Sequence, residues 1–248
     1  MSGRQNGNDT SFTFSTGIDS VKVVSPAQIQ IDSTYAMSRN APFVNTSQPC
    51  SLKVLMENMG DERANSFYMH LSSTGGSDFP DSIFVPFLDG HHNLAVIFPI
   101  TASSVPNPNE IFASSISGGT GSMSGNPALI NPPVDNNSLL ITETPAELWL
   151  SQINIIAPPG ALDSTISIDQ VVTLSVTVIN LGQAAISGPR NLTFYPGDIS
   201  WGVDSLQRDY MLGLPTIWQV TAPSIAIDSA GLSIGITGSP IDENDGST

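Results

Sequence analysis

The sequence predicts an all-β protein built from two tandem Ig-like antiparallel β-sandwiches. Three observations support this fold class: an internal repeat, segments in which apolar and polar residues alternate, and many turn-forming residues. The chain has 248 residues, including 21 glycines and 19 prolines, which suit short strands joined by turns. Helical periodicity is weak throughout, so we expect no helical domain.

The clearest part of the repeat aligns residues 50–60 with residues 172–182, at an offset of 122. The first copy reads C-S-L-K-V-L-M-E-N-M-G and the second reads V-T-L-S-V-T-V-I-N-L-G. Gln48 falls on Gln170 at the same offset. A repeat of this length corresponds to a whole domain rather than to one turn of a solenoid.

A second match lies further along the chain, at an offset of 120. I-T-A at 100–102 pairs with V-T-A at 220–222, and S-S-I-S-G at 114–118 pairs with I-G-I-T-G at 234–238. The same offset places Trp218 on Phe98, which marks Trp218 as a core position.

The repeat and the local composition divide the chain into five segments. We expect a flexible polar arm at 1–19 that could add an edge strand, a first sandwich at 20–117, a Gly/Ser/Asn/Pro-rich linker or exposed loop at 118–138, a second sandwich at 139–240 and an acidic tail at 241–248 that frays.

Alternation of apolar residues and the positions of turn residues predict the strands of both units. In the segment 50–57, for example, Leu52, Val54 and Met56 face one side and Lys53 faces the other. The expected strands lie near 20–24, 27–31, 50–57, 66–71, 83–87, 94–100 and 111–117, and then near 139–142, 148–156, 170–179, 191–195, 216–221 and 232–237.

An Asn-x-Gly sequence follows the repeated strand in both copies, as Asn58–Gly60 and Asn180–Gly182. Asparagine and glycine both tolerate positive φ, so each pair can turn the chain sharply between two strands. We therefore interpret Asn58, Gly60, Asn180 and Gly182 as structural turn residues.

The strand and turn together resemble the CARDB-type adhesion-related domains, an Ig-like family found in bacterial proteins. In that family a strand V-x-V-x-V-x-N-x-G precedes a stretch of small residues and an aliphatic or aromatic strand. The two copies here read L-K-V-L-M-E-N-M-G-D-E-R-A-N-S-F-Y-M-H-L and L-S-V-T-V-I-N-L-G-Q-A-A-I-S-G-P-R-N-L-T-F-Y. The resemblance implies Ig-like repeats of a kind that also suits accessory proteins of phage virions, and it implies no catalytic residue.

The charge balance limits the classes of partner. The net charge is -15, only 12% of residues are charged, and Lys22 and Lys53 are the only lysines. Such a chain repels nucleic-acid phosphates and anionic membranes. We therefore expect neither nucleic acid nor membrane as a partner.

The chain contains few histidines and cysteines, residue types that often carry out chemistry or bind metals. We expect His91 and His92 to be polar loop residues, because adjacent side chains on a strand point in opposite directions. The only cysteine, Cys50, is interpreted as a buried structural thiol. We predict no cofactor, no metal and no catalytic residue. Trp201 lies in a predicted loop and is the candidate interface residue.

These observations favour a non-enzymatic structural protein of a virion. The leading hypothesis is a phage capsid decoration or accessory subunit, assembled in many copies, that binds the major capsid protein or other virion proteins through strand edges and loops. Residues 1–10 contain no apolar segment typical of a signal peptide, so we expect synthesis in the host cytoplasm followed by incorporation into the virion. Two alternatives remain: a jelly-roll coat protein of a small icosahedral virus, and a carbohydrate-binding or adhesion module.

Overall fold

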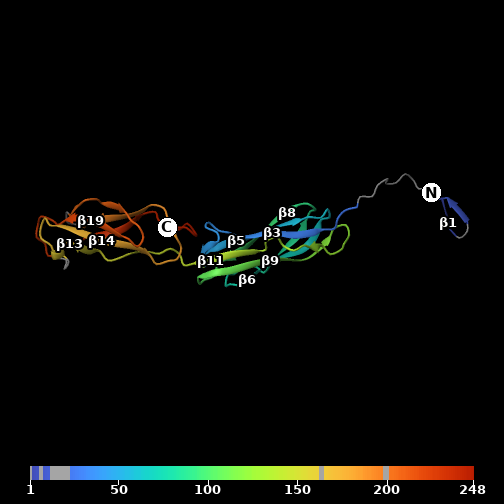
Figure 1. Ribbon diagram of the computed structural model, residues 1–248, viewed down its shortest axis with the longest axis horizontal. Coiled ribbons are helices and arrows are strands. Elements are labelled where there is room, and N and C mark those ends of the chain that lie inside the picture. The colour runs from blue at the N-terminus through green and yellow to red at the C-terminus, as the bar shows by residue number, and fades with distance from the viewer. Residues whose placement is uncertain (1, 6–7, 12–22, 162–164, 198–200) are drawn as a thin grey trace.

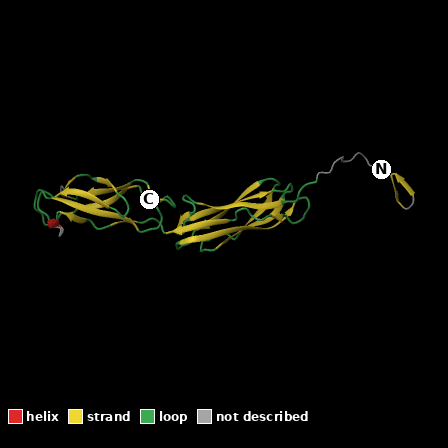
Figure 2. Ribbon diagram, in the orientation of Figure 1, coloured by secondary structure: helices red, strands yellow, loops and turns green. Residues whose placement is uncertain are grey.

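The protein consists of two β-sandwiches that lie end to end (Figure 1). The computed structural model describes residues 2–5, 8–11, 23–161, 165–197 and 201–248. Strands and loops make up nearly all of the described chain, and the only short 3-10 turn, η1 (Pro159–Ala161), lies at the end of the second sandwich that faces away from the first (Figure 2). The predicted all-β, tandem Ig-like fold is confirmed.

The first sandwich packs a four-stranded sheet, ordered β10-β3-β5-β8, against a five-stranded sheet, ordered β4-β11-β9-β6-β7. Most pairs are antiparallel, but β10 with β3 and β11 with β4 are parallel. The strand bounds are β3 (Gln28–Met37), β4 (Phe43–Asn45), β5 (Pro49–Asn58), β6 (Ala64–Ser73), β7 (Ser82–Leu88), β8 (Asn93–Thr101), β9 (Asn107–Gly121), β10 (Leu129–Ile130) and β11 (Asn137–Glu143).

The second sandwich is built in the same way from shorter strands. One sheet is ordered β12-β14-β19-β17 with β13 also paired to β14, and it faces a three-stranded sheet ordered β18-β16-β20. The strand bounds are β12 (Leu148–Leu150), β13 (Asn154–Ala157), β14 (Val171–Asn180), β15 (Ile186–Ser187), β16 (Arg190–Tyr195), β17 (Gly202–Val203), β18 (Gln207–Asp209), β19 (Pro215–Thr221), β20 (Ser233–Gly238) and β21 (Ile241–Asp242).

Equivalent residues form equivalent pairs in the two cores, which gives the sequence repeat its physical meaning. Leu52 pairs with Phe98 in the first sandwich, and Leu174 pairs with Trp218 in the second. All four side chains are buried. The expected core position of Trp218 is therefore confirmed, and the indole and phenyl rings fill the same place in the two sandwiches.

The repeated glutamine also has one role in both copies. The Gln48 side chain accepts a hydrogen bond from the Asn45 backbone N–H at 2.6 Å, and the Gln170 side chain accepts one from the Ser167 N–H at 2.7 Å. The backbone N–H of each glutamine also donates a hydrogen bond to the carbonyl oxygen of that same residue, Asn45 or Ser167. Each glutamine therefore closes the loop that leads into the repeated strand.

The segment 118–138, predicted as a linker or exposed loop, contains mostly exposed loops at 122–128 and 131–136 but does not connect the two sandwiches. This segment contains the end of β9, all of β10 and the start of β11, and each of these strands pairs within the first sandwich. The polar composition suggested a linker because only the end of β9, the two-residue edge strand β10 and the first two residues of β11 fall in this segment. The first sandwich therefore continues to Glu143, and the second sandwich begins after the short connection at 144–147 rather than at 139.

The two ends of the chain also differ from expectation. In the predicted arm, β1 (Ser2–Gln5) and β2 (Asn8–Ser11) pair with each other as an antiparallel hairpin, and no described strand of a sandwich pairs with them. Residues 12–22 lie outside the described part of the chain. The predicted acidic tail does not fray, because β21 pairs with β15 and Asn244 is completely buried.

The Asn-x-Gly turns work through the asparagine side chain rather than through positive φ. Asn58 Oδ1 accepts hydrogen bonds from the N–H groups of Gln28 (3.0 Å) and Gly60 (3.2 Å), and its Nδ2 donates to two backbone carbonyls. Asn180 Oδ1 likewise accepts from Glu147 (2.9 Å) and Gly182 (3.1 Å). Each amide thus fastens the first strand of its sandwich to the turn.

The two turn glycines are required by close packing. Neither has a φ in the left-handed region, which corrects the predicted reason for the glycines. A Cβ on Gly60 would overlap the carbonyl oxygen of Pro26, and a Cβ on Gly182 would overlap that of Pro145. Because backbone atoms cannot swing away as a side-chain end can, the overlap must move a strand.

We expect Gly60→Ala and Gly182→Ala to destabilise their respective sandwiches by about 3 kcal/mol each, because the new methyl group collides with a fixed carbonyl. Thermal unfolding followed by circular dichroism measures the change. Gly231→Ala is the matched control, since a Cβ there meets open space. A Gly60→Ala protein as stable as the control would contradict the packing argument.

Candidate functional site

A buried polar network joins the two sandwiches. Asn244, from the C-terminal segment, donates its amide to Asn45 Oδ1 at 3.2 Å and to Glu143 Oε2 at 3.0 Å, and accepts from Asn40 Nδ2 at 3.0 Å. Asp242 Oδ2 accepts from Asn45 Nδ2 at 3.0 Å. In Figure 1 the C-terminus accordingly lies between the two sandwiches. The last residues of the chain therefore hold the end of the first sandwich against the second.

The opposite end of the second sandwich, which we call the tip, is the counterpart of this covered end. The loop residues Ser167 and Gln170 of the tip match Asn45 and Gln48 in the repeat and form the same internal bonds. In the first sandwich this end contacts the C-terminal segment. No described residue of the chain makes the corresponding contact at the tip.

The tip contains a cavity of about 970 Å³, lined by apolar side chains, several of them isoleucines, together with polar ones such as Gln152 and Ser229. Leu174 and Trp201 form its buried side, and Ile168, Ile225 and Ile227 form its exposed side. Among the described lining residues, Asp228 is the only charged one. Apolar side chains around an open cavity of this size are typical of sites that accept an apolar group from a ligand or partner.

Trp201, the predicted interface residue, is not an exposed loop residue. Its side chain is 9% exposed and belongs to the core of the second sandwich. Its indole N–H has no hydrogen-bond partner among the described residues. The turn-forming sequence around Trp201 predicted exposure, but the ring folds inward and becomes part of the cavity wall.

The first sandwich carries an uncharged group of exposed side chains that we call the aromatic–serine patch. Its residues come from neighbouring outward positions of three strands of the five-stranded sheet: Phe84 and Ser82 of β7, Tyr68 and His70 of β6, and Ser117 and Ser115 of β9. Tyr68 and Phe84 are 45% and 51% exposed, and their ring centroids are 5.3 Å apart. The sequence analysis missed this patch because alternation alone does not reveal which outward residues become neighbours.

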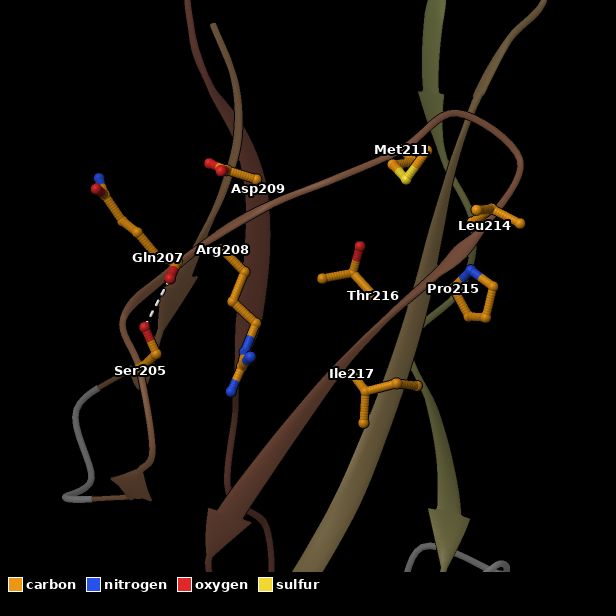
Figure 3. Close-up of a pocket in the computed structure, with 9 residues that line it drawn as sticks. All are labelled: Ser205, Gln207, Arg208, Asp209, Met211, Leu214, Pro215, Thr216 and Ile217. Atoms are coloured by element: carbon orange, nitrogen blue, oxygen red, sulfur yellow. Dashed lines mark hydrogen bonds between the residues drawn. The ribbon is translucent and has the colours of Figure 1, made fainter.

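A second, shallower groove of about 520 Å³ lies on the second sandwich (Figure 3). Arg208 projects along the groove and already has partners within the chain. Its guanidinium donates a hydrogen bond to the Asp204 carboxylate at 2.5 Å and lies 5.8 Å from the centroid of the Trp218 ring. Ser205 donates its hydroxyl to the Gln207 carbonyl at 2.6 Å, as the dashed line shows. Since the only cation in the groove already has a carboxylate partner, the groove is better explained as packing around β18 than as an anion site.

The three histidines form hydrogen bonds in loops and on the surface. His91 Nε2 lies 3.0 Å from Asp61 Oδ1, whereas His92 Nδ1 lies 2.7 Å from the carbonyl oxygen of Gly90. The Ser25 backbone N–H, the Ser25 hydroxyl and His91 together hold the pKa of Asp61 well below its usual range. Within the described ranges, no group of three or more His, Cys, Asp or Glu residues is arranged to hold a metal ion.

Two buried carboxylates fasten loops of the first sandwich. Glu110 accepts hydrogen bonds from the hydroxyls of Ser73 (2.5 Å) and Ser77 (2.7 Å). Glu62 accepts from the Ser124 backbone and side chain, and the Ser124 backbone bond is the main cause of its lowered pKa. Because neighbouring donors satisfy both carboxylates, their burial has a structural explanation.

Cys50 packs against the first core and is partly buried. Desolvation, with a smaller contribution from the charge of Glu110, raises the pKa of its thiol to about 11. The thiolate is the reactive form of cysteine, so this thiol is weakly reactive at neutral pH. No described helix is both long and apolar enough to cross a membrane.

No protein-family model matches this chain, and no curated protein matches it. Solved structures with a similar arrangement include the D0-D1 domain of intimin, with a TM-score of 0.29 at 9% identity over 79% of this chain and 86% of that one. A non-cellulosomal cohesin from Archaeoglobus fulgidus has a TM-score of 0.27 at 14% identity over 47% and 91%. The secreted serine protease VesC from Vibrio cholerae has a TM-score of 0.27 at 9% identity over 83% and 50%.

We expect Asn244→Ala to release the two sandwiches from their fixed arrangement, because it leaves several buried polar groups at the junction without partners, at a cost of about 2–4 kcal/mol. Small-angle scattering should show a broader distribution of interdomain distances. Thr248→Ala, at the exposed end of the same segment, is the control. Scattering identical to that of the unmodified chain would rule out the proposed role of Asn244.

The raised pKa predicts that Cys50 reacts slowly with iodoacetamide at pH 8 and faster as the pH approaches 11, because only the thiolate attacks the reagent. Mass spectrometry of the folded protein over a pH series measures the rate. The urea-unfolded chain is the reference, and it should react with the pH dependence of an ordinary thiol. A rate in the folded protein equal to the unfolded rate at pH 8 would contradict the assignment.

Proposed function

We propose that the chain is a non-enzymatic structural and interaction subunit of a virion, a capsid decoration or accessory protein present in many copies. The observation that supports this proposal best is that the two sandwiches differ at equivalent ends. The C-terminal segment covers the end of the first sandwich with a buried polar network, whereas among the described residues the equivalent tip of the second carries an open, isoleucine-rich cavity. A tandem protein with one uncovered end is suited to attach through that end.

The chemistry of the tip favours a protein partner. Ile225, Ile168 and Ile227 are 71%, 53% and 44% exposed at the cavity. Burying such side chains against a partner contributes roughly 25 cal/mol per Å² of apolar surface. An aliphatic or aromatic side chain of the shell protein would fill the cavity, and the net charge of -15 would keep free copies from aggregating.

Attachment through the tip replaces the expected use of strand edges. The edge strands β7 and β8 of the first sandwich contain Pro86 and Pro99. Proline has no N–H to donate to an added strand, and it commonly protects sheet edges from pairing. The loops and the cavity of the tip are therefore the better contact surface in this proposal.

The jelly-roll alternative does not agree with the fold. A single jelly roll has eight strands around one core, whereas this chain forms two sandwiches with two separate buried clusters. A jelly-roll coat protein is therefore not proposed. The carbohydrate-binding alternative has a specific surface in its favour, the aromatic–serine patch of the first sandwich.

Attachment to particles tests the proposal. In the native source fraction, negative-stain imaging and sedimentation should find the chain on assembled particles, and particles stripped of it should bind the purified chain again. Ile225→Asp should lower this binding by at least about tenfold, since a charge would be buried at the contact.

Val134→Asp is the matched control, because Val134 is 72% exposed on the first sandwich, away from the tip. It should bind as the unmodified chain does. A purified chain that stays a free monomer and has no affinity for stripped particles would overturn the virion proposal. Equal loss of binding in both variants would overturn the assignment of the tip.

A further inference from the structure

We propose that the aromatic–serine patch on the first sandwich binds an uncharged glycan. Two rows of outward side chains cross the sheet there, Phe84–Tyr68–Ser117 and Ser82–His70–Ser115. His70 Nε2 lies 2.6 Å from the Ser117 hydroxyl and the His70 ring lies 6.2 Å from the Tyr68 ring. The histidine therefore fixes one row beside the other.

The composition of the patch matches the two sides of a sugar ring. A pyranose has C–H groups on its faces and hydroxyls around its edge, so it can lie against an aromatic ring and form hydrogen bonds at its periphery. Tyr68 and Phe84 provide exposed ring surface. The serine hydroxyls and the phenol can each donate and accept hydrogen bonds. The rows continue across three strands, so they offer adjacent positions to successive sugar units.

The charge of the patch and of the whole chain favours a neutral glycan over an anionic one. None of the six residues of the patch is an Asp, Glu, Lys or Arg, and the chain as a whole has a net charge of -15. A sulfated, sialylated or uronic-acid-rich polymer would be repelled by this field and would find no cation on the patch. A neutral hexose polymer is not repelled by the negative charge of the chain and needs no cation on the patch.

The same composition argues against a protein partner at this position. Protein interfaces are enriched in aromatic residues and arginine but depleted in serine, whereas half of this patch is serine. Arg63, which directly precedes β6, is held by Asp89 at 2.5 Å and lies over the Phe87 ring. Pro86 also interrupts the donor groups of β7, the edge strand that carries Phe84 and Ser82 of the patch.

The patch and the tip belong to different sandwiches, so a chain attached by its tip keeps the patch accessible. The inference does not depend on the virion proposal, because the patch would bind a glycan equally well on a free chain. A failure of particle binding and a failure of glycan binding are thus separate results.

Affinity electrophoresis and titration calorimetry of the full chain against a panel of soluble polysaccharides test the inference. The neutral probes are dextran, yeast mannan and galactomannan, and the anionic probes are alginate and heparin. At least one neutral probe should retard the chain and no anionic probe should. Tyr68→Ser and Phe84→Ser should each weaken that binding by about tenfold or more, as expected when one ring contact is lost.

Two further variants separate a binding role from a structural one. Tyr68→Phe should keep most of the affinity because it keeps the ring. Ile97→Ser is the matched control, because Ile97 is 51% exposed on the outer face of the other sheet, and it should bind normally. The inference is overturned if no neutral probe binds, if only anionic probes bind, or if Ile97→Ser weakens binding as much as Tyr68→Ser. Loss of particle attachment in Tyr68→Ser, with no glycan bound by the unmodified chain, would instead indicate a protein contact.

Discussion

The amide of one asparagine side chain, buried in the first copy and half-buried in the second, is the interaction on which each sandwich depends. Asn58 and Asn180 end the repeated strand, and their side chains hold the first strand of the sandwich and the turn at once. A side-chain amide carries both donors and an acceptor. At the point where the sheet ends, it can therefore form the hydrogen bonds that a neighbouring strand's backbone would otherwise form. The following glycine is then forced by contact with a proline carbonyl. This fastening adds to the strand pairing that already sets the register of β3 against β5.

The same construction was used twice, and the differences between the copies lie where function is expected. The equivalent ends of the two sandwiches share the glutamine-closed loop. In the first copy this loop carries Asn45, which bonds the C-terminal segment, and in the second it borders an apolar cavity. Repeated domains keep the residues that fold them and change the residues that face neighbours. The polar junction and the cavity of the tip therefore occupy equivalent ends of the two sandwiches.

The two proposed surfaces have different chemistry because they have different tasks. The tip is apolar and concave, which suits the loss of water against a protein. The aromatic–serine patch is flat, uncharged and rich in hydroxyls, which suits a partner that keeps part of its hydration. The buried polar network at the junction holds both surfaces in a fixed relation along one rod (Figure 1).

The sequence alone determined the fold class, most strands and the equivalence of the two units. Alternation and recurrence are local properties, so they located strands such as β5 and β14 within one or two residues. Only the tertiary structure decided the rest. Composition placed a linker at 118–138, but strand pairing assigns this segment to the first sandwich. A loop sequence predicted that Trp201 is exposed, but packing buries it. The patch and the junction could not be predicted, because they join residues that are distant in sequence, and only strand order and register bring those residues together.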